Sequence, residues 1–136
     1  MHSRFPLGFS LFFAGLVAIP LTGCDSGGPE LGSVSGVVTV DDRPLPDATV
    51  EFQPPSGSPS MGLTDSFGKY KLMYTAKRPG AMLGKHLVRI TLERANAEGS
   101  NTGVPQPLPA KYNRNSELTA EVTSGSNKID FALKSK

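Results

Sequence analysis

The clearest fold signal in the chain is the segment Lys85-His86-Leu87-Val88-Arg89-Ile90-Thr91-Leu92-Glu93. Its side chains alternate, so that His86 and three large aliphatic residues share one face, and the other positions share the opposite face. Successive side chains of a β-strand point to opposite sides, and a period of two is typical of a strand with one buried face. The segment therefore predicts a strand whose even-numbered residues point into a core.

The same alternation recurs in five further segments, which turns rich in Gly, Pro, Asp and Asn separate from one another. A seventh, shorter strand is expected over residues 61–64, and no segment has the period of an amphipathic helix. About seven short strands predict an all-β fold, an antiparallel Greek-key β-sandwich. The core is expected to contain Val34, Val38, Val40, Val50, Phe52, Leu72, Val88, Ile90, Leu92, Leu118, Val122, Ile129, Phe131 and Leu133.

The N-terminal segment has the organisation of an export signal. Arg4 is the only basic residue before an apolar run over residues 5–21, which is too short and interrupted for a stable membrane-spanning helix. The run ends in Leu21-Thr22-Gly23-Cys24, which resembles the bacterial lipobox, where a signal peptidase cleaves before a cysteine that carries a diacylglycerol. We expect a signal peptide over residues 1–23 and a lipid on Cys24.

The rest of the chain then divides into a short linker and one domain. Residues 24–32 are small and polar and predict a flexible tether, and residues 33–136 are long enough for one core. We expect the protein to be anchored to a membrane, in the cell envelope or at the cell surface. The sequence does not decide between the inner and the outer membrane. Because Cys24 is the only cysteine, no disulfide is expected.

Charge and loop composition narrow the expected partners. Of the 14 basic and 12 acidic residues, only Arg4 precedes Cys24, so the charges of the remaining chain nearly balance. The sequence also contains no basic stripe that would indicate nucleic-acid binding. The loops over residues 54–60, 76–84 and 94–110 are the expected places for a partner. That partner is an unidentified envelope protein or glycan, in addition to the membrane that holds the lipid on Cys24.

Two stretches of the predicted domain resemble the carboxypeptidase regulatory-like family, which has a transthyretin-like (prealbumin-like) sandwich. The opening strands over residues 35–40 and 43–52 follow the family pattern, although Arg43 and Asp47 stand where the family often has glycine. Thr64-Asp65-Ser66-Phe67-Gly68-Lys69-Tyr70 matches the family's second signature. The resemblance covers residues 33 to 134 and implies a domain that contributes no catalytic residue.

Asp65 and Gly68 admit two interpretations. Asp65 is an oxygen ligand on a loop and could bind a cation, but calcium needs six to eight oxygens and no second carboxylate follows in this loop. The alternative is a structural turn, in which Asp65 accepts backbone hydrogen bonds and Gly68 adopts a positive φ. We favour the turn and expect no metal or cofactor.

Three other features are candidates for chemistry. His86 is the only histidine after Cys24, and no nucleophile in a recognisable motif accompanies it, so we expect a partly buried strand residue and no catalytic residues. Asp41 and Asp42 are expected in a solvated turn rather than as an acid–base or metal pair. Transthyretin-like hydrolases share the expected fold but use more than one histidine, and this chain has only His86 after Cys24.

The sequence therefore predicts a lipid-anchored protein that is not an enzyme, with a binding or structural β-sandwich. The alternative is a carbohydrate- or peptide-binding accessory module of an exported enzyme system. A sugar site favours exposed aromatic residues, and Tyr112 is the best candidate for a binding-loop aromatic.

Overall fold

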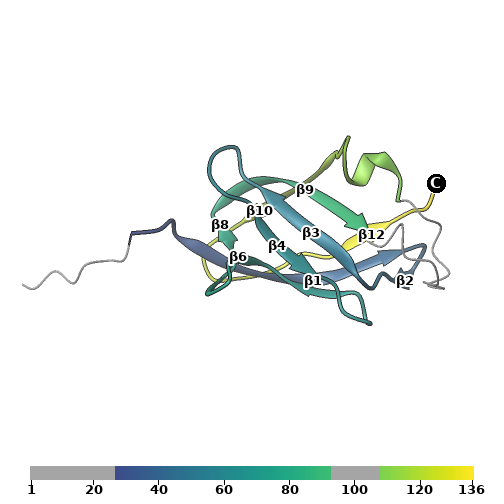
Figure 1. Cartoon of the computed structure of the whole chain (residues 1–136), viewed down its shortest axis with the longest axis horizontal. Helices are drawn as coiled ribbons and strands as arrows, with labels where there is room; N and C mark the ends of the chain where they lie inside the picture. The colour runs from purple at the N-terminus through teal and green to yellow at the C-terminus, as the bar shows by residue number, and fades with distance from the viewer. Residues whose placement is uncertain (1–26, 93–107) are drawn as a thin grey trace, which may run out of the picture.

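The computed structural model of the chain describes residues 27–92 and 108–136, and these fold as two packed β-sheets (Figure 1). The predicted all-β sandwich is confirmed. The expected signal peptide over residues 1–23, Cys24 and most of the loop over residues 94–110 lie outside the described residues. In the described part of the chain, no helix is long and apolar enough to cross a bilayer.

The first sheet is built around β1 (Leu31–Val40), which is bordered by short strands on both sides. Its pairings with β11 and β12 are parallel, whereas the sequence predicted antiparallel pairing throughout. The chain reaches β11 after leaving the second sheet, so it can enter this sheet in the direction of β1. The partners of β1 are β2 (Arg43–Pro44), β5 (Lys69–Lys71), β8 (Ala81–Met82), β11 (Ser126–Lys128) and β12 (Phe131–Leu133).

The second sheet has the order β10-β9-β3-β4-β6-β7, and all of its pairings are antiparallel. The strong alternation of the sequence is seen in β9, where Val88 lies opposite Phe52 and Ile90 opposite Val50. Its strands are β3 (Ala48–Gln53), β4 (Ser60–Leu63), β6 (Met73–Thr75), β7 (Arg78–Pro79), β9 (Gly84–Leu92) and β10 (Leu118–Val122).

Several expected boundaries are wrong in detail. The described residues contain twelve strand segments rather than about seven, because many partners of β1 are fragments of two or three residues. The expected loop over residues 76–84 contains β7, β8 and the start of β9. Since β1 begins at Leu31, the last two residues of the expected tether over residues 24–32 belong to the domain.

The core lies between the sheets and contains most of the residues predicted to point inward. Phe52 of β3 meets Phe131 of β12 edge to face, with ring centroids 6.1 Å apart, and so joins the two sheets. Leu92, Leu118 and Ile129 are only partly buried against this core. The buried apolar residues are Val34, Val38, Val40, Leu45, Ala48, Val50, Phe52, Tyr70, Leu72, Ala81, Val88, Ile90, Leu108, Tyr112, Val122, Phe131 and Leu133.

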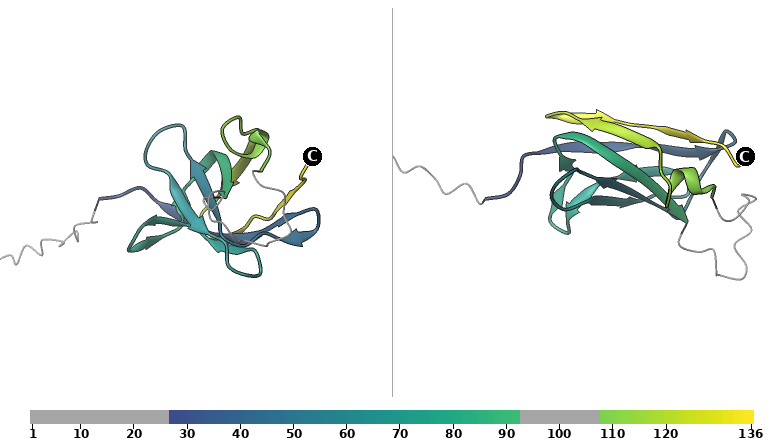
Figure 2. Two further views of the ribbon diagram at one scale, coloured as in Figure 1. Left: turned by 45° about the vertical axis from the view of Figure 1, so that its right-hand side comes forward. Right: turned by 90° about the horizontal axis from the view of Figure 1, so that it is seen from above.

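The described chain enters and leaves the sandwich at opposite ends (Figures 1 and 2). Residues 27–30 lead into β1 at one end, which we call the N-terminal end. The C-terminus lies at the other end, which we call the far end, together with the turn that follows β1 at Val40. Loops at the N-terminal end are therefore next to the segment that would connect to Cys24.

Candidate functional site

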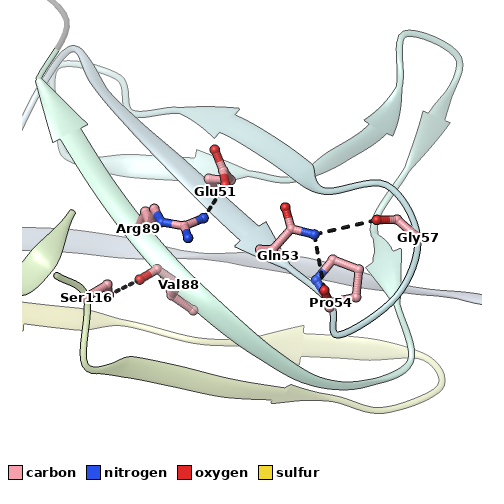
Figure 3. A network of polar contacts seen from close by, with 7 residues as sticks. All are labelled: Glu51, Gln53, Pro54, Gly57, Val88, Arg89 and Ser116. Atoms are coloured by element: carbon pink, nitrogen blue, oxygen red, sulfur yellow. Dashed lines mark hydrogen bonds and ion pairs between the residues drawn. The ribbon is translucent and has the colours of Figure 1, made fainter. Parts of the chain in front are cut away.

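The best candidate for a binding surface is the outer face of the second sheet, formed by the odd-numbered residues of β3, β9 and β10. Glu51 and Arg89 are direct cross-strand neighbours, and an Arg89 Nη1–H donates to Glu51 Oε1 at 2.9 Å (Figure 3). Their side chains are 27% and 37% exposed, so solvent screens the pair and it contributes at most about 1 kcal/mol. The pair fixes two charged groups in the middle of the face.

Beside this ion pair, a shallow groove of about 330 Å³ follows the end of β3 and the start of β9. Thr119, Leu87 and Gln53 form one row across three neighbouring strands. The groove is lined by Gln53, Pro54, Pro55, Lys85, His86, Leu87 and Thr119, and its accessible walls are mainly apolar.

The side chain of Gln53, at one wall of the groove, ties the loop over residues 54–59 to the sheet (Figure 3). The Gln53 amide nitrogen donates to the carbonyl of Pro54 at 3.1 Å and to that of Gly57 at 3.5 Å. Two consecutive prolines restrict the same loop, because each fixes its own φ. A preformed wall with apolar faces and a few polar groups can bind an extended segment without much ordering cost.

Ser116 lies two residues before β10, beside the outer face. Its hydroxyl donates to the carbonyl of Val88 (Figure 3). The same hydroxyl accepts the backbone N–H of Leu118 at 3.2 Å. Both contacts satisfy backbone groups at a strand end, so the hydroxyl holds β10 against β9 and is engaged in structure.

His86 points away from this face and into the core, where only 1% of the residue is exposed. Its Nε2 lies 2.7 Å from the carbonyl of Met82, which can only accept, so Nε2 carries the proton in the neutral ring. The ring packs against Phe52 with centroids 5.6 Å apart, and buried Nδ1 has no partner among the described residues. The imidazole is therefore sealed from solvent, although the histidine was expected to be only partly buried.

Asp65 and Gly68 lie in the turn between β4 and β5. Asp65 Oδ1 accepts the backbone N–H groups of Phe67 and Lys69, both at 2.9 Å, and Gly68 has a φ of 74°. The carbonyl of Gly68 accepts the N–H of Val38 at 2.8 Å, which docks the turn on β1. Within residues 27–92 and 108–136, no three His, Cys, Asp or Glu residues cluster in a way that could hold a metal ion.

Asp41 and Asp42 form the two-residue turn between β1 and β2, with φ values of 49° and 66°. Positive φ at both central positions is typical of a type I′ hairpin turn. The carboxylate of Asp41 accepts the hydroxyl and the N–H of Ser135 near the C-terminus. These hydrogen bonds lower the pKa of Asp41, and so do the positive charges of Lys134 and Arg43. The pair thus has a structural role at the far end.

Tyr112 is not a binding-loop aromatic, which corrects the prediction from the sequence. It ends a 3₁₀ turn (Ala110–Tyr112) and is only 8% exposed. Its hydroxyl accepts the N–H of Lys134 at 2.9 Å, so the ring packs in the core and its polar atom secures the end of β12. Leu108 is buried beside the same turn, and neither residue lies in a segment with a strand period that could have identified it.

The sequence matches no family model and no curated protein at a significant level. A solved structure that matches is the crystal structure of a DUF3823 family protein from Parabacteroides merdae, with 11% sequence identity and a TM-score of 0.45. The match covers 77% of this chain and 46% of that one, so this chain spans less than half of that protein. This likeness is too slight to define a family or a function.

Proposed function

We propose that the protein is a lipid-anchored component of the bacterial cell envelope, with a β-sandwich that binds a partner or has a structural role and does not catalyse a reaction. The observation that carries the proposal is the sequence Leu21-Thr22-Gly23-Cys24 after an apolar run. Residues 25–30 would then separate the lipid from β1, and they reach on the order of 20 Å when fully extended. The domain would be held close to the membrane with its N-terminal end nearest.

The environment of His86 supports a role without catalysis. A general base must reach the proton that it removes, directly or through one water molecule. The His86 ring is buried, its Nε2 is engaged by the carbonyl of Met82, and Phe52 covers one side. No other histidine is present among the described residues.

The groove on the outer face supports a binding role and favours an extended peptide over a glycan. Its walls include Pro54, Pro55 and Leu87, and no Phe, Tyr or Trp ring among the described residues lines it on which a sugar could stack. Gln53 and Lys85 supply polar groups at its borders. A segment of another envelope protein, with apolar side chains spaced along an extended backbone, fits these features best.

Photo-crosslinking in cells tests this binding role. A photoreactive amino acid at Leu87, in the groove, should give an adduct of discrete mass that is lost on protease treatment. The matched control is the same amino acid at Ser35, an exposed position of β1 outside the groove. Equal adducts at both positions would contradict a binding role for the groove, and an adduct lost only on glycan digestion would replace the peptide by a glycan.

A further inference from the structure

We propose that the N-terminal end of the sandwich binds the headgroups of anionic phospholipids through Lys77 and Arg78. The proposal rests on the lipid anchor proposed above, because the anchor would bring this end to the membrane. It adds a second contact, which would orient the domain on the bilayer.

The two cations border a polar cleft of about 580 Å³ directly beside the segment that leads to Cys24. The cleft lies between residues 28–31 and 77–79. Arg78 is fixed there, because its Nη2–H donates to the carbonyl of Pro29 at 2.8 Å and its guanidinium lies 5.6 Å from the ring centroid of Tyr74. A preoriented guanidinium next to an exposed ammonium is a suitable pair of donors for a phosphate group.

Neither cation is paired with a carboxylate among the described residues. Lys77 is exposed, and neither Lys77 nor Arg78 has a carboxylate oxygen within 4.0 Å among the described residues. Glu30 is the acidic residue that lines the cleft, and its Oε1 accepts the hydroxyl of Ser124 at 3.3 Å. The carboxylate is therefore engaged by a neighbouring turn rather than by the two cations.

The other loops at this end carry no charge that would repel a membrane. The loop over residues 54–59 approaches Met82, which pairs with Leu31 at the start of β1. The turn over residues 123–127 packs on the same end, where the Asn127 side chain donates to the carbonyl of Ser33 at 3.0 Å. Neither segment contains an acidic or basic residue.

Charge and hydrophobicity along the molecule favour the same orientation. At the far end the carboxylates of Asp41 and Asp42 lie beside the cations Arg43 and Lys134, so that end has mixed charge. At the N-terminal end, no carboxylate of the described chain is paired with Lys77 or Arg78. Leu83 follows β8 at the N-terminal end and is 36% exposed, so it can enter the interfacial region. Electrostatic attraction falls off over about 8 Å at physiological salt, and a tether that reaches on the order of 20 Å would let Lys77 and Arg78 come within that distance of the surface.

Reconstitution of the full-length, processed protein into vesicles tests the proposal. A fluorophore on Leu83→Cys, attached after lipidation, should be quenched by headgroup-labelled lipid at least about twofold more in vesicles of phosphatidylcholine with phosphatidylglycerol than in phosphatidylcholine alone. Lys77→Gln with Arg78→Gln should abolish this difference, and the single exposed change Lys77→Glu should do so while preserving the Arg78 contact with Pro29. Lys69→Gln, an exposed change on β5, is the matched control and should leave the difference intact.

The outcomes separate this proposal from the anchor itself. Co-flotation with vesicles of pure phosphatidylcholine reports the lipid on Cys24, whereas the difference in quenching reports the cations. Equal quenching in both vesicles, or a difference that Lys77→Glu leaves unchanged in a protein with the normal unfolding midpoint, would overturn the proposal. Loss of the difference with inorganic phosphate, but not with chloride at equal ionic strength, would also overturn it in favour of a site for free phosphate.

Discussion

At the scale of single residues, the backbone conformation of a few turn positions explains why the chain has these amino acids there. Gly68 needs a positive φ, and a Cβ at this position would lie 2.4 Å from the carbonyl oxygen of Val38. The glycine could be predicted from the signature over residues 64–70. The close approach to β1 could not, because it depends on a contact between segments 30 residues apart in the sequence.

Gly68→Ala is expected to destabilise the domain by about 2 kcal/mol or more, from a strained φ and a clash with backbone atoms that cannot move easily. The matched control is Gly125→Ala, which has a φ of 90° and no atom within 4 Å of the added Cβ. Gly125→Ala should lower the free energy of unfolding by only about 1 kcal/mol, because its backbone φ is strained but its Cβ meets no atom. Urea unfolding measures both, and equal losses would show that the approach to Val38 is unimportant.

A second residue-scale prediction concerns pH. Hydrogen bonds from Ser135 lower the pKa of Asp41 in the folded protein, so its ionised form stabilises the fold at neutral pH. This contribution is present above the ordinary pKa of 3.8 and is lost as the pH falls through the lower folded value. Asp41→Asn, which tolerates a positive φ, should therefore be less stable than the wild type at pH 7, and the difference should shrink as the pH falls below 3.8.

Denaturant unfolding at a series of pH values checks this prediction, and Ser135→Ala provides the control. In a Ser135→Ala background, the effect of Asp41→Asn should shrink, because the hydroxyl that favours the carboxylate is gone. An effect of Asp41→Asn that stays constant from neutral to acidic pH would contradict the account.

At the scale of elements, the period of two identified the long strands and missed the fragments. β3 and β9 have one buried and one exposed face, so their positions follow from the sequence. β7 and β8 contain two residues each and have no period, and a proline stands in β7. The groove on the outer face could not be predicted from the sequence either, because it depends on which strands are neighbours in the sheet.

Gly36 shows how β1 serves as the centre of its sheet. It continues the inward alternation, and a Cβ there would lie 1.8 Å from the carbonyl oxygen of Ile129 and 3.0 Å from Cε1 of Tyr70. The Tyr70 hydroxyl donates to that same carbonyl at 2.6 Å, so the missing side chain lets two flanking segments meet across β1. Burial and the negative charge of Asp130 raise the pKa of Tyr70, which keeps this donor protonated.

Gly36→Ala should therefore destabilise the domain by about 3 kcal/mol, since it overpacks a site enclosed by backbone. Gly27→Ala is the matched control, because no atom lies within 4 Å of its added Cβ, and it should leave stability unchanged within about 0.5 kcal/mol. Thermal unfolding followed by circular dichroism measures both changes. A loss for Gly36→Ala as small as that of the control would contradict this packing.

At the scale of the whole molecule, the sandwich separates two ends with different surroundings. The N-terminal end contains the start of β1, the cations Lys77 and Arg78 and two loops without charged residues. The far end contains the turn after Val40, where acidic and basic side chains lie together. This difference between the two ends underlies the orientation on a membrane that we propose. It could not be predicted from the sequence, because Lys77 and Arg78 become neighbours of residues 28–31 only when β7 and β8 fold back toward the start of β1.

The measurement that tests the central claim most directly is metabolic labelling with a fatty-acid probe, comparing the wild type with Cys24→Ser. On this account the thiol of Cys24 would accept the diacylglycerol, and a hydroxyl is a far weaker nucleophile, so we expect label on the wild type and none on Cys24→Ser. Gly27→Ala, a change beyond the lipobox, should be labelled like the wild type. Equal labelling of the wild type and Cys24→Ser, or no label on either, would contradict a lipid anchor at Cys24.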